Sequence, residues 1–184
     1  MKDPFIQTYT GQKFNFCELD PKTVNILDIA HALSMLVRFN GHIIRHYSVA
    51  QHSWFAAKVC METTGDKRLS YITLLHDISE VYLSDLCRPI KTVLPDYIEM
   101  ENKLLLGLYN CFGVSEEEYK DTKEQVKTFD NIALITEATQ LLASPPIDNW
   151  ITAYPAEPYS EELITLLPHE AKDLFLMKFY QLQS

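Results

Sequence analysis

Apolar residues recur every three or four positions along most of this chain, which is the spacing of one face of an α-helix. Asp28 and Ser48 stand where the first two helices would begin, and both are suitable N-caps. The stretch 145–160 is rich in proline and aromatic residues and is typical of a loop, because proline lacks the amide hydrogen that a helix requires. The pattern predicts helices over approximately residues 28–40, 48–65, 67–87, 96–112, 116–142 and, in one or two pieces, 161–182.

The first residues follow a different pattern. Two aromatic runs flank Gly11 between residues 5 and 17, and they predict a short hairpin or an extended arm. No internal repeat and no long linker interrupts the chain. We therefore expect one all-α domain, a bundle of six or seven helices with a small N-terminal β-hairpin or arm. The single domain is expected over residues 1–184, with the arm at 1–27, the core at 28–142, and a loop with C-terminal helices at 143–184.

Composition and charge narrow the class of protein. The 184 residues are 47% hydrophobic and 22% charged, as in ordinary soluble globular proteins. The formal net charge of −9 and the scattered basic residues argue against a nucleic-acid polymer as partner. The four cysteines show no CxxC spacing, which argues against a zinc ribbon.

The apolar segments of the chain bear on its localisation. The first residues have no apolar stretch of the kind found in signal peptides, and the run Leu104–Val114 is too short to cross a bilayer. We expect a cytoplasmic protein without membrane association. Self-association stays open, because the aromatic residues near Trp150 and Tyr154 suit either an interface or a cover over the core.

Candidate chemistry begins in the third predicted helix, which is apolar on nearly all sides, as buried helices are. His76, Asp77 and Glu80 lie in its middle, and a buried carboxylate is costly without a partner. Glu80 follows His76 by four residues and Asp77 by three, so we expect it to lie over the same patch of helix surface. A cation there would satisfy all three side chains. The plainer alternative is a core histidine with a satisfied hydrogen bond beside a solvated aspartate.

Two further ionisable residues lie on apolar stripes of other predicted helices. His52 belongs to the second helix and Asp130 to the fifth. Alone, each is more often a core histidine or a helix cap. Together with His76 and Asp77 they offer two imidazoles and two carboxylates from three core helices. That composition suits an open site for a divalent transition metal.

The order His52, His76-Asp77, Asp130 resembles the H…HD…D pattern of the HD-domain metal-dependent phosphohydrolases. The similarity is greatest to the small nucleotide-hydrolysing branch, which includes bacterial 5′-deoxynucleotidases, phage dATP triphosphohydrolases and the oxetanocin-A pathway phosphohydrolase. In that branch the motif continues as HDxSEvxxxDlxxPvK, with an Arg-aromatic pair before the first histidine. The matching segments here are HDISEV at 76–81, Asp85-Leu86, Pro89-Ile90-Lys91 and Arg38-Phe39, and the resemblance covers residues 28–142.

The resemblance implies a role for each matched residue. Glu80 would orient water or pass a proton, and Asp85 would be a second acid/base or a sugar contact, its alternative being a plain loop aspartate. Arg38 would offer a planar fork to phosphate and Lys91 a point charge. Phe39 would form a wall of the base pocket, its alternative being core packing. The implied ligands of a divalent ion, which could be Co, Mn, Zn, Ni or Mg, are His52, His76, Asp77 and Asp130.

The function implied is a metal-dependent phosphohydrolase that removes phosphate from nucleoside 5′-phosphates by metal-activated water. Purine deoxynucleotides such as dAMP, dADP and dATP, or their analogues, are the expected substrates. The alternative is a regulatory module of the same fold that binds nucleotide or metal without turnover. A third and more distant alternative is a helical interaction protein in which the motif is fortuitous.

Overall fold

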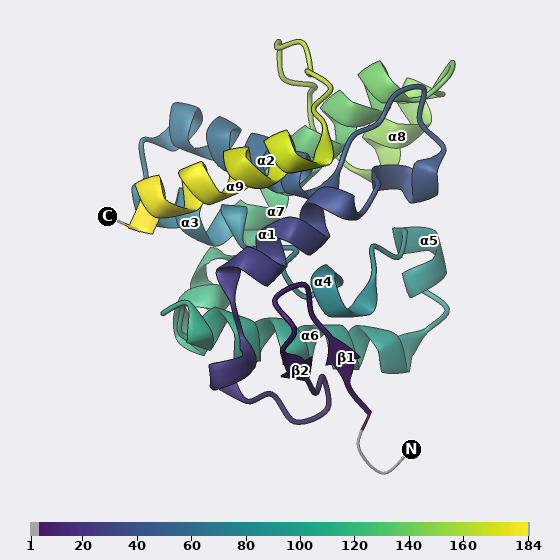
Figure 1. Cartoon of the computed structure of the whole chain (residues 1–184). Coiled ribbons are helices and arrows are strands. Elements are labelled where there is room, and N and C mark those ends of the chain that lie inside the picture. The colour runs from purple at the N-terminus through teal and green to yellow at the C-terminus, as the bar shows by residue number, and fades with distance from the viewer. Residues whose placement is uncertain (1–3, 184) are drawn as a thin grey trace.

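A computed structural model describes residues 4–183, which form a bundle of helices with a two-stranded sheet at one end (Figure 1). Strands β1 (Ile6–Gln7) and β2 (Lys13–Phe14) pair antiparallel. The predictions of an all-α chain and of an N-terminal hairpin are confirmed, but the described residues form nine helices where six or seven were expected. The helices are α1 (Ile26–Met35), α2 (Val49–Thr64), α3 (Lys67–Leu74), α4 (Glu80–Leu83), α5 (Arg88–Lys91), α6 (Pro95–Cys111), α7 (Glu116–Leu141), α8 (Ile147–Ala153) and α9 (Pro168–Gln183). Residues 1–3 and 184, within the expected domain range 1–184, lie outside the described residues.

Helix α2 lies at the centre of the bundle. It packs against α1, α3, α7 and α9, and Figure 1 shows α9 crossing this group near the C-terminus. Residues from all five helices are fully buried in one hydrophobic core, among them Ile29, Val59, Leu74, Leu141 and Phe175. His52, in the first turn of α2, is fully buried at the centre of this bundle.

The ends of α2 are set by local signals in the sequence. The Ser48 side chain accepts the Gln51 amide hydrogen, and the Gln51 side chain in turn accepts the Ser48 amide hydrogen, which completes a capping box. Gly65 ends the helix in the left-handed conformation, at φ 67°, which glycine adopts without steric cost. The helix predicted over 48–65 is confirmed.

The first helix begins and ends earlier than predicted. Asn25, not Asp28, caps α1. Asp28 is buried and instead accepts hydrogen bonds from the Thr10 amide, at 2.6 Å, and from the Thr10 hydroxyl, at 2.8 Å, so it ties the hairpin to the bundle. The helix ends at Met35, because the following residue is extended.

The third predicted helix is broken. Helix α3 ends at Leu74 and α4 begins at Glu80, so His76 and Asp77 lie in the turn between them. The imidazole Nδ1 of His76 donates to the Thr73 carbonyl at 2.7 Å. In a continuing helix that carbonyl would accept from the amide of residue 77. The expectation that Glu80 shares a helical face with His76 is therefore wrong.

The remaining predictions hold in part. Helices α6 and α7 match the ranges 96–112 and 116–142 to within one residue at each end. The stretch 145–160 is not a continuous loop, because it contains α8, which follows two prolines. Within the described residues, no helix is long and apolar enough to cross a membrane.

Candidate metal centre

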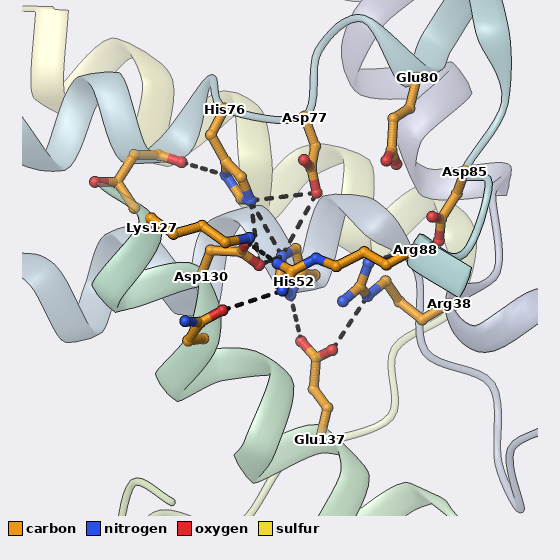
Figure 2. Close-up of polar contacts among 12 residues, drawn as sticks. Arg38, His52, His76, Asp77, Glu80, Asp85, Arg88, Lys127, Asp130 and Glu137 are labelled. Atoms are coloured by element: carbon orange, nitrogen blue, oxygen red, sulfur yellow. Dashed lines mark hydrogen bonds and ion pairs between the residues drawn. The ribbon is translucent and has the colours of Figure 1, made fainter. Parts of the chain in front are cut away.

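The predicted metal ligands meet at one point from three separate segments. His52 comes from α2, His76 and Asp77 from the turn after α3, and Asp130 from α7 (Figure 2). The two imidazole Nε2 atoms lie 3.2 Å apart. Asp130 Oδ1 lies 3.3 Å from the Nε2 atom of His52 and 3.8 Å from that of His76. Asp77 Oδ2 lies 3.5 Å from His52 Nε2 and 3.2 Å from His76 Nε2.

Hydrogen bonds fix which ring nitrogen faces this point. His52 Nδ1 lies 2.6 Å from Glu137 Oε1, and His76 Nδ1 lies 2.7 Å from the Thr73 carbonyl oxygen. Both partners are acceptors, so both Nδ1 atoms carry the hydrogen and both Nε2 atoms keep a lone pair in the neutral rings. Two lone pairs that face each other require a positive charge between or beside them.

The charges around the cluster also favour a positive charge at this point. Burial opposes protonation of His76, but the charges of Asp77 and Asp130 prevail and raise its pKa to about 10. Burial alone would raise the pKa values of these two carboxyls, but the neighbouring imidazoles hold both well below the ordinary range. The cluster therefore attracts positive charge, which a proton or a metal ion can supply.

The donor set fits a divalent metal. His52, His76 and Asp130 offer ligand atoms that all lie within 4.8 Å of one another. Metal–nitrogen and metal–oxygen bonds of about 2.0–2.2 Å place neighbouring ligand atoms at about 3.0–3.5 Å from each other, and most of the distances above lie in that range. This group could hold a divalent ion, with Asp77 as a fourth candidate ligand.

A cavity of about 310 Å³ opens beside the cluster. It is lined by both candidate carboxylate ligands and by every residue predicted to act in catalysis or substrate binding, namely Arg38, Phe39, Glu80, Asp85 and Lys91. The sequence motif thus brings together residues from four segments of the chain. A second cavity, of about 190 Å³, reaches His76, Asp77 and Asp130 from the side of α6 and α7.

Arg38 is held in the wall of this cavity by two carboxylates. Its Nε donates to Glu137 Oε2 at 3.1 Å, and its Nη1 lies 3.6 Å from Asp85 Oδ2. Burial lowers the Arg38 pKa, but the charges of Glu137 and Asp85 outweigh burial and raise it, so the guanidinium stays charged. Phe39 follows in the left-handed conformation, at φ 54°, which is uncommon for a bulky residue and turns its ring to the cavity.

Glu80 has one satisfied and one unsatisfied oxygen. Its Oε1 lies 3.4 Å from Lys91 Nζ, which also donates to Glu101 Oε1 at 2.7 Å. Its Oε2 is buried without a hydrogen-bond partner. Burial raises the Glu80 pKa well above its ordinary value, and the charges of Asp77 and Asp85 raise it further. A buried polar atom of this kind at a cavity wall is available to a water molecule or a ligand.

The structure also brings in residues that sequence reasoning did not assign. Glu137 joins His52 to Arg38, and its position two helical turns after Asp130 on the same face was the available signal. Arg88 Nη2 and Lys127 Nζ donate to Asp130 Oδ2 at 2.6 Å and 2.7 Å. Lys127 precedes Asp130 by three positions on α7, a spacing that places the two side chains together.

The fold and this cluster define the chain as a helical protein with a buried imidazole–carboxylate centre. No family model matches it. It is 32% identical over 181 residues to the uncharacterized protein YfdR of Escherichia coli (strain K12), an alignment that covers 98% of this chain and 96% of the relative. It is 27% identical over 146 residues to the uncharacterized protein RCAP_rcc00048 of Rhodobacter capsulatus, covering 77% of this chain and 74% of the relative. The chain belongs to the same family as YfdR.

Proposed function

We propose that this protein is a metal-dependent phosphohydrolase that acts on small nucleoside 5′-phosphates. The observation that carries the proposal is the cluster of His52, His76 and Asp130, because Asp130 lines the same cavity as a charged arginine and a buried, half-satisfied glutamate. A divalent ion held there would polarise a phosphoryl oxygen and favour ionisation of water near neutral pH. The resemblance to the HD-domain phosphohydrolases supports the same reaction.

Arg38 is the group best suited to bind the phosphate. Phosphoryl transfer gathers negative charge on the equatorial oxygens, and a planar guanidinium can pair with two of them. Glu137 holds the Arg38 Nε, so the guanidinium plane is fixed before substrate arrives. A contact that is already oriented loses little entropy on binding and tightens as charge builds up in the transition state. Lys91 adds a second cation at the same wall.

Glu80 is the group best suited to hold or move a proton. Burial and the charges of Asp77 and Asp85 raise its pKa, which favours the protonated form and makes a proton available for transfer. Its unsatisfied Oε2 would contact the attacking water or the leaving oxygen. Asp85, whose pKa burial also raises although Arg38 opposes the shift, could act as a second acid/base or contact the sugar.

The charge of the cavity favours small substrates. Five carboxyl groups and four basic side chains line it, so without a metal its walls carry no excess of positive charge. A dication makes the cavity locally positive, while the protein as a whole has a formal net charge of −9. A mononucleotide places its phosphate at the one positive centre, whereas a polymer would bring further phosphates against an acidic surface. Deoxyadenosine phosphates are the preferred candidates, by resemblance.

Phosphate release tests the proposal. The chelator-treated protein is reloaded separately with Mn²⁺, Co²⁺, Ni²⁺, Zn²⁺ and Mg²⁺ and incubated with dNMP, dNDP, dNTP, a short single-stranded DNA and p-nitrophenyl phosphate. We expect nucleotides to be hydrolysed best with at least one ion, and Arg38→Ala to weaken both binding and rate. Nucleotide binding without turnover under every ion would instead favour a regulatory module. Preference for the oligonucleotide or the aryl phosphate would contradict the substrate class alone.

A further inference from the structure

Three aromatic side chains lie at the cavity instead of in the core. Phe39, Trp150 and Tyr154 all line the cavity beside the metal cluster, and none of them joins the buried core or packs against it. Trp150 lies edge-to-face with Phe39, with ring centroids 5.9 Å apart, and its own centroid is 5.8 Å from that of Tyr154. The covering role considered for Trp150 and Tyr154 from sequence is therefore not what these rings do.

Arg88 connects these rings to the candidate metal site. Its Nη2 donates to Asp130 Oδ2 at 2.6 Å and its Nη1 to Asn131 Oδ1 at 3.2 Å. The same guanidinium lies over the Tyr154 ring, 4.7 Å from its centroid. A single side chain thus contacts both a candidate metal ligand and one of the aromatic rings.

We propose that Trp150 and Tyr154, with Arg88 held over the Tyr154 ring, form an aromatic shelf that binds the base of a nucleotide by stacking. The inference rests on the proposed function, since it assigns the base end of the same substrate. Half-buried rings at a cavity wall gain apolar contact when a planar ligand covers them, and a guanidinium stacks on bases as well as on tyrosine. The larger purine ring covers more of the shelf than a pyrimidine, so the shelf favours purines.

The shelf makes substrate affinity depend on α8. This helix has seven residues between two prolines and Tyr154, and it packs against α7, which carries Asp130. Base binding at Trp150 and Tyr154 and phosphate binding at Arg38 therefore use different side chains that line the same cavity. A phosphate ester without a base would gain from the Arg38 contact only.

Kinetics with matched substrates test the shelf. Trp150→Ala and Tyr154→Ala should each raise the KM for dAMP by about tenfold to a hundredfold, the usual effect of losing one base–aromatic stack, with a smaller change in kcat. The KM for deoxyribose 5-phosphate, which has no base, should stay within about twofold of the wild-type value. Tyr154→Phe keeps the ring and should behave as wild type. Equal losses for both substrates would overturn the shelf.

Fluorescence gives a test that does not require turnover. The chain has two tryptophans, and Trp54 lies on α2 outside this cavity, so Trp54→Phe leaves Trp150 as the reporter. We expect dAMP to quench the emission of the Zn²⁺-loaded variant, and deoxyribose 5-phosphate to leave it unchanged. Quenching by dAMP without hydrolysis would support the shelf while contradicting the proposed activity. Hydrolysis of dAMP without quenching and with an unchanged KM in Trp150→Ala and Tyr154→Ala would overturn the shelf and leave the activity standing.

Discussion

Glu137 Oε1 lies 2.6 Å from His52 Nδ1, and its other oxygen accepts from the Nε of Arg38 at 3.1 Å. All three side chains are buried, and Glu137 is fully so. One carboxylate therefore sets the tautomer of a candidate metal ligand and the plane of the candidate phosphate-binding arginine (Figure 2). Carboxylates in this position commonly orient a ligand histidine and raise its basicity.

Glu137→Gln should weaken both functions at once. The glutamine oxygen can accept the hydrogen bond from His52, but the NH₂ group then faces the Arg38 Nε. Both of these groups are donors, so the contact with Arg38 is lost. We expect metal affinity to fall by about tenfold to a hundredfold and the KM for nucleotide to rise. Competition with a chelating dye measures the first effect and steady-state kinetics the second. Glu117→Gln, at an exposed position of the same helix, is the control, and equal values in the two variants would contradict the positioning role.

Asp77→Ala should abolish metal retention and hydrolysis together. The substitution removes a charge that lies 3.2 Å and 3.5 Å from the two histidine Nε2 atoms, so a bound cation would be poorly compensated. Metal content after gel filtration and phosphate release measure the two losses. Asp121→Ala, on the exposed surface of α7, should change neither. Full activity in Asp77→Ala would remove Asp77 from the metal site.

The sequence was sufficient for the long helices because their ends carry local signals. Ser48, Gly65 and Ser115 mark ends of α2 and α7 through their own caps, so periodicity and capping together gave these bounds. The break after Leu74 was missed, because it depends on the His76 side chain taking a backbone carbonyl from the helix. The periodicity of hydrophobic residues carries no information about a hydrogen bond from a side chain to the backbone.

The candidate site, like the fold, was predicted from the sequence only in part. The motif supplied the four ligand candidates and the residues that line the cavity, since each belongs to a short run with distinctive spacing. Glu137 has no such run, and its partnership with His52 joins residues 85 positions apart. Trp150 on α8 and Tyr154 directly after it were visible in the sequence as aromatic residues, but only the packing of α8 against α7 places them at the cavity. The positions of Glu137 and of these rings thus depend on packing between distant segments, which a local sequence pattern does not reveal.

Metal affinity should rise with pH. Although burial opposes it, the charges of Asp77 and Asp130 raise the pKa of His76 to about 10, so below that pH an incoming cation must displace a proton. We expect affinity to increase about tenfold per pH unit for each proton displaced. Calorimetry in two buffers of different ionisation enthalpy should detect the released proton. An affinity independent of pH between 7 and 9 would contradict this account.

The same proton affects the stability of the metal-free protein. A folded pKa above the ordinary value of 6.5 stabilises the fold fully below pH 6.5, and the stabilisation is lost as pH rises toward 10. The Tm of the metal-free protein should therefore fall between pH 7 and pH 10. Saturating metal should reduce that fall, because the cation replaces the proton as the positive charge. Thermal melts at matched ionic strength, with and without metal, provide the comparison.

Glu80→Gln should separate metal binding from chemistry. Glu80 faces Lys91, and the candidate metal-binding group consists of His52, His76 and Asp130, so loss of its charge should leave metal affinity nearly unchanged. The glutamine keeps the shape and the contact with Lys91 but cannot exchange a proton at the atom that replaces Oε2. We expect kcat to fall by about two to four orders of magnitude, which is the usual contribution of a positioned general acid or base.

The measurement pairs metal content with single-turnover phosphate release, so that slow product release does not mask the chemical step. Glu99→Gln, at an exposed position of α6, controls for removal of a surface carboxylate and should retain wild-type values. If Glu80→Gln lost the metal, Glu80 would have to be a ligand, because no loss of a proton carrier explains a lost ion. If it kept both metal and full kcat, the proton would have to move through another group. Asp85, which is half-buried at the same cavity wall, would be the residue to test.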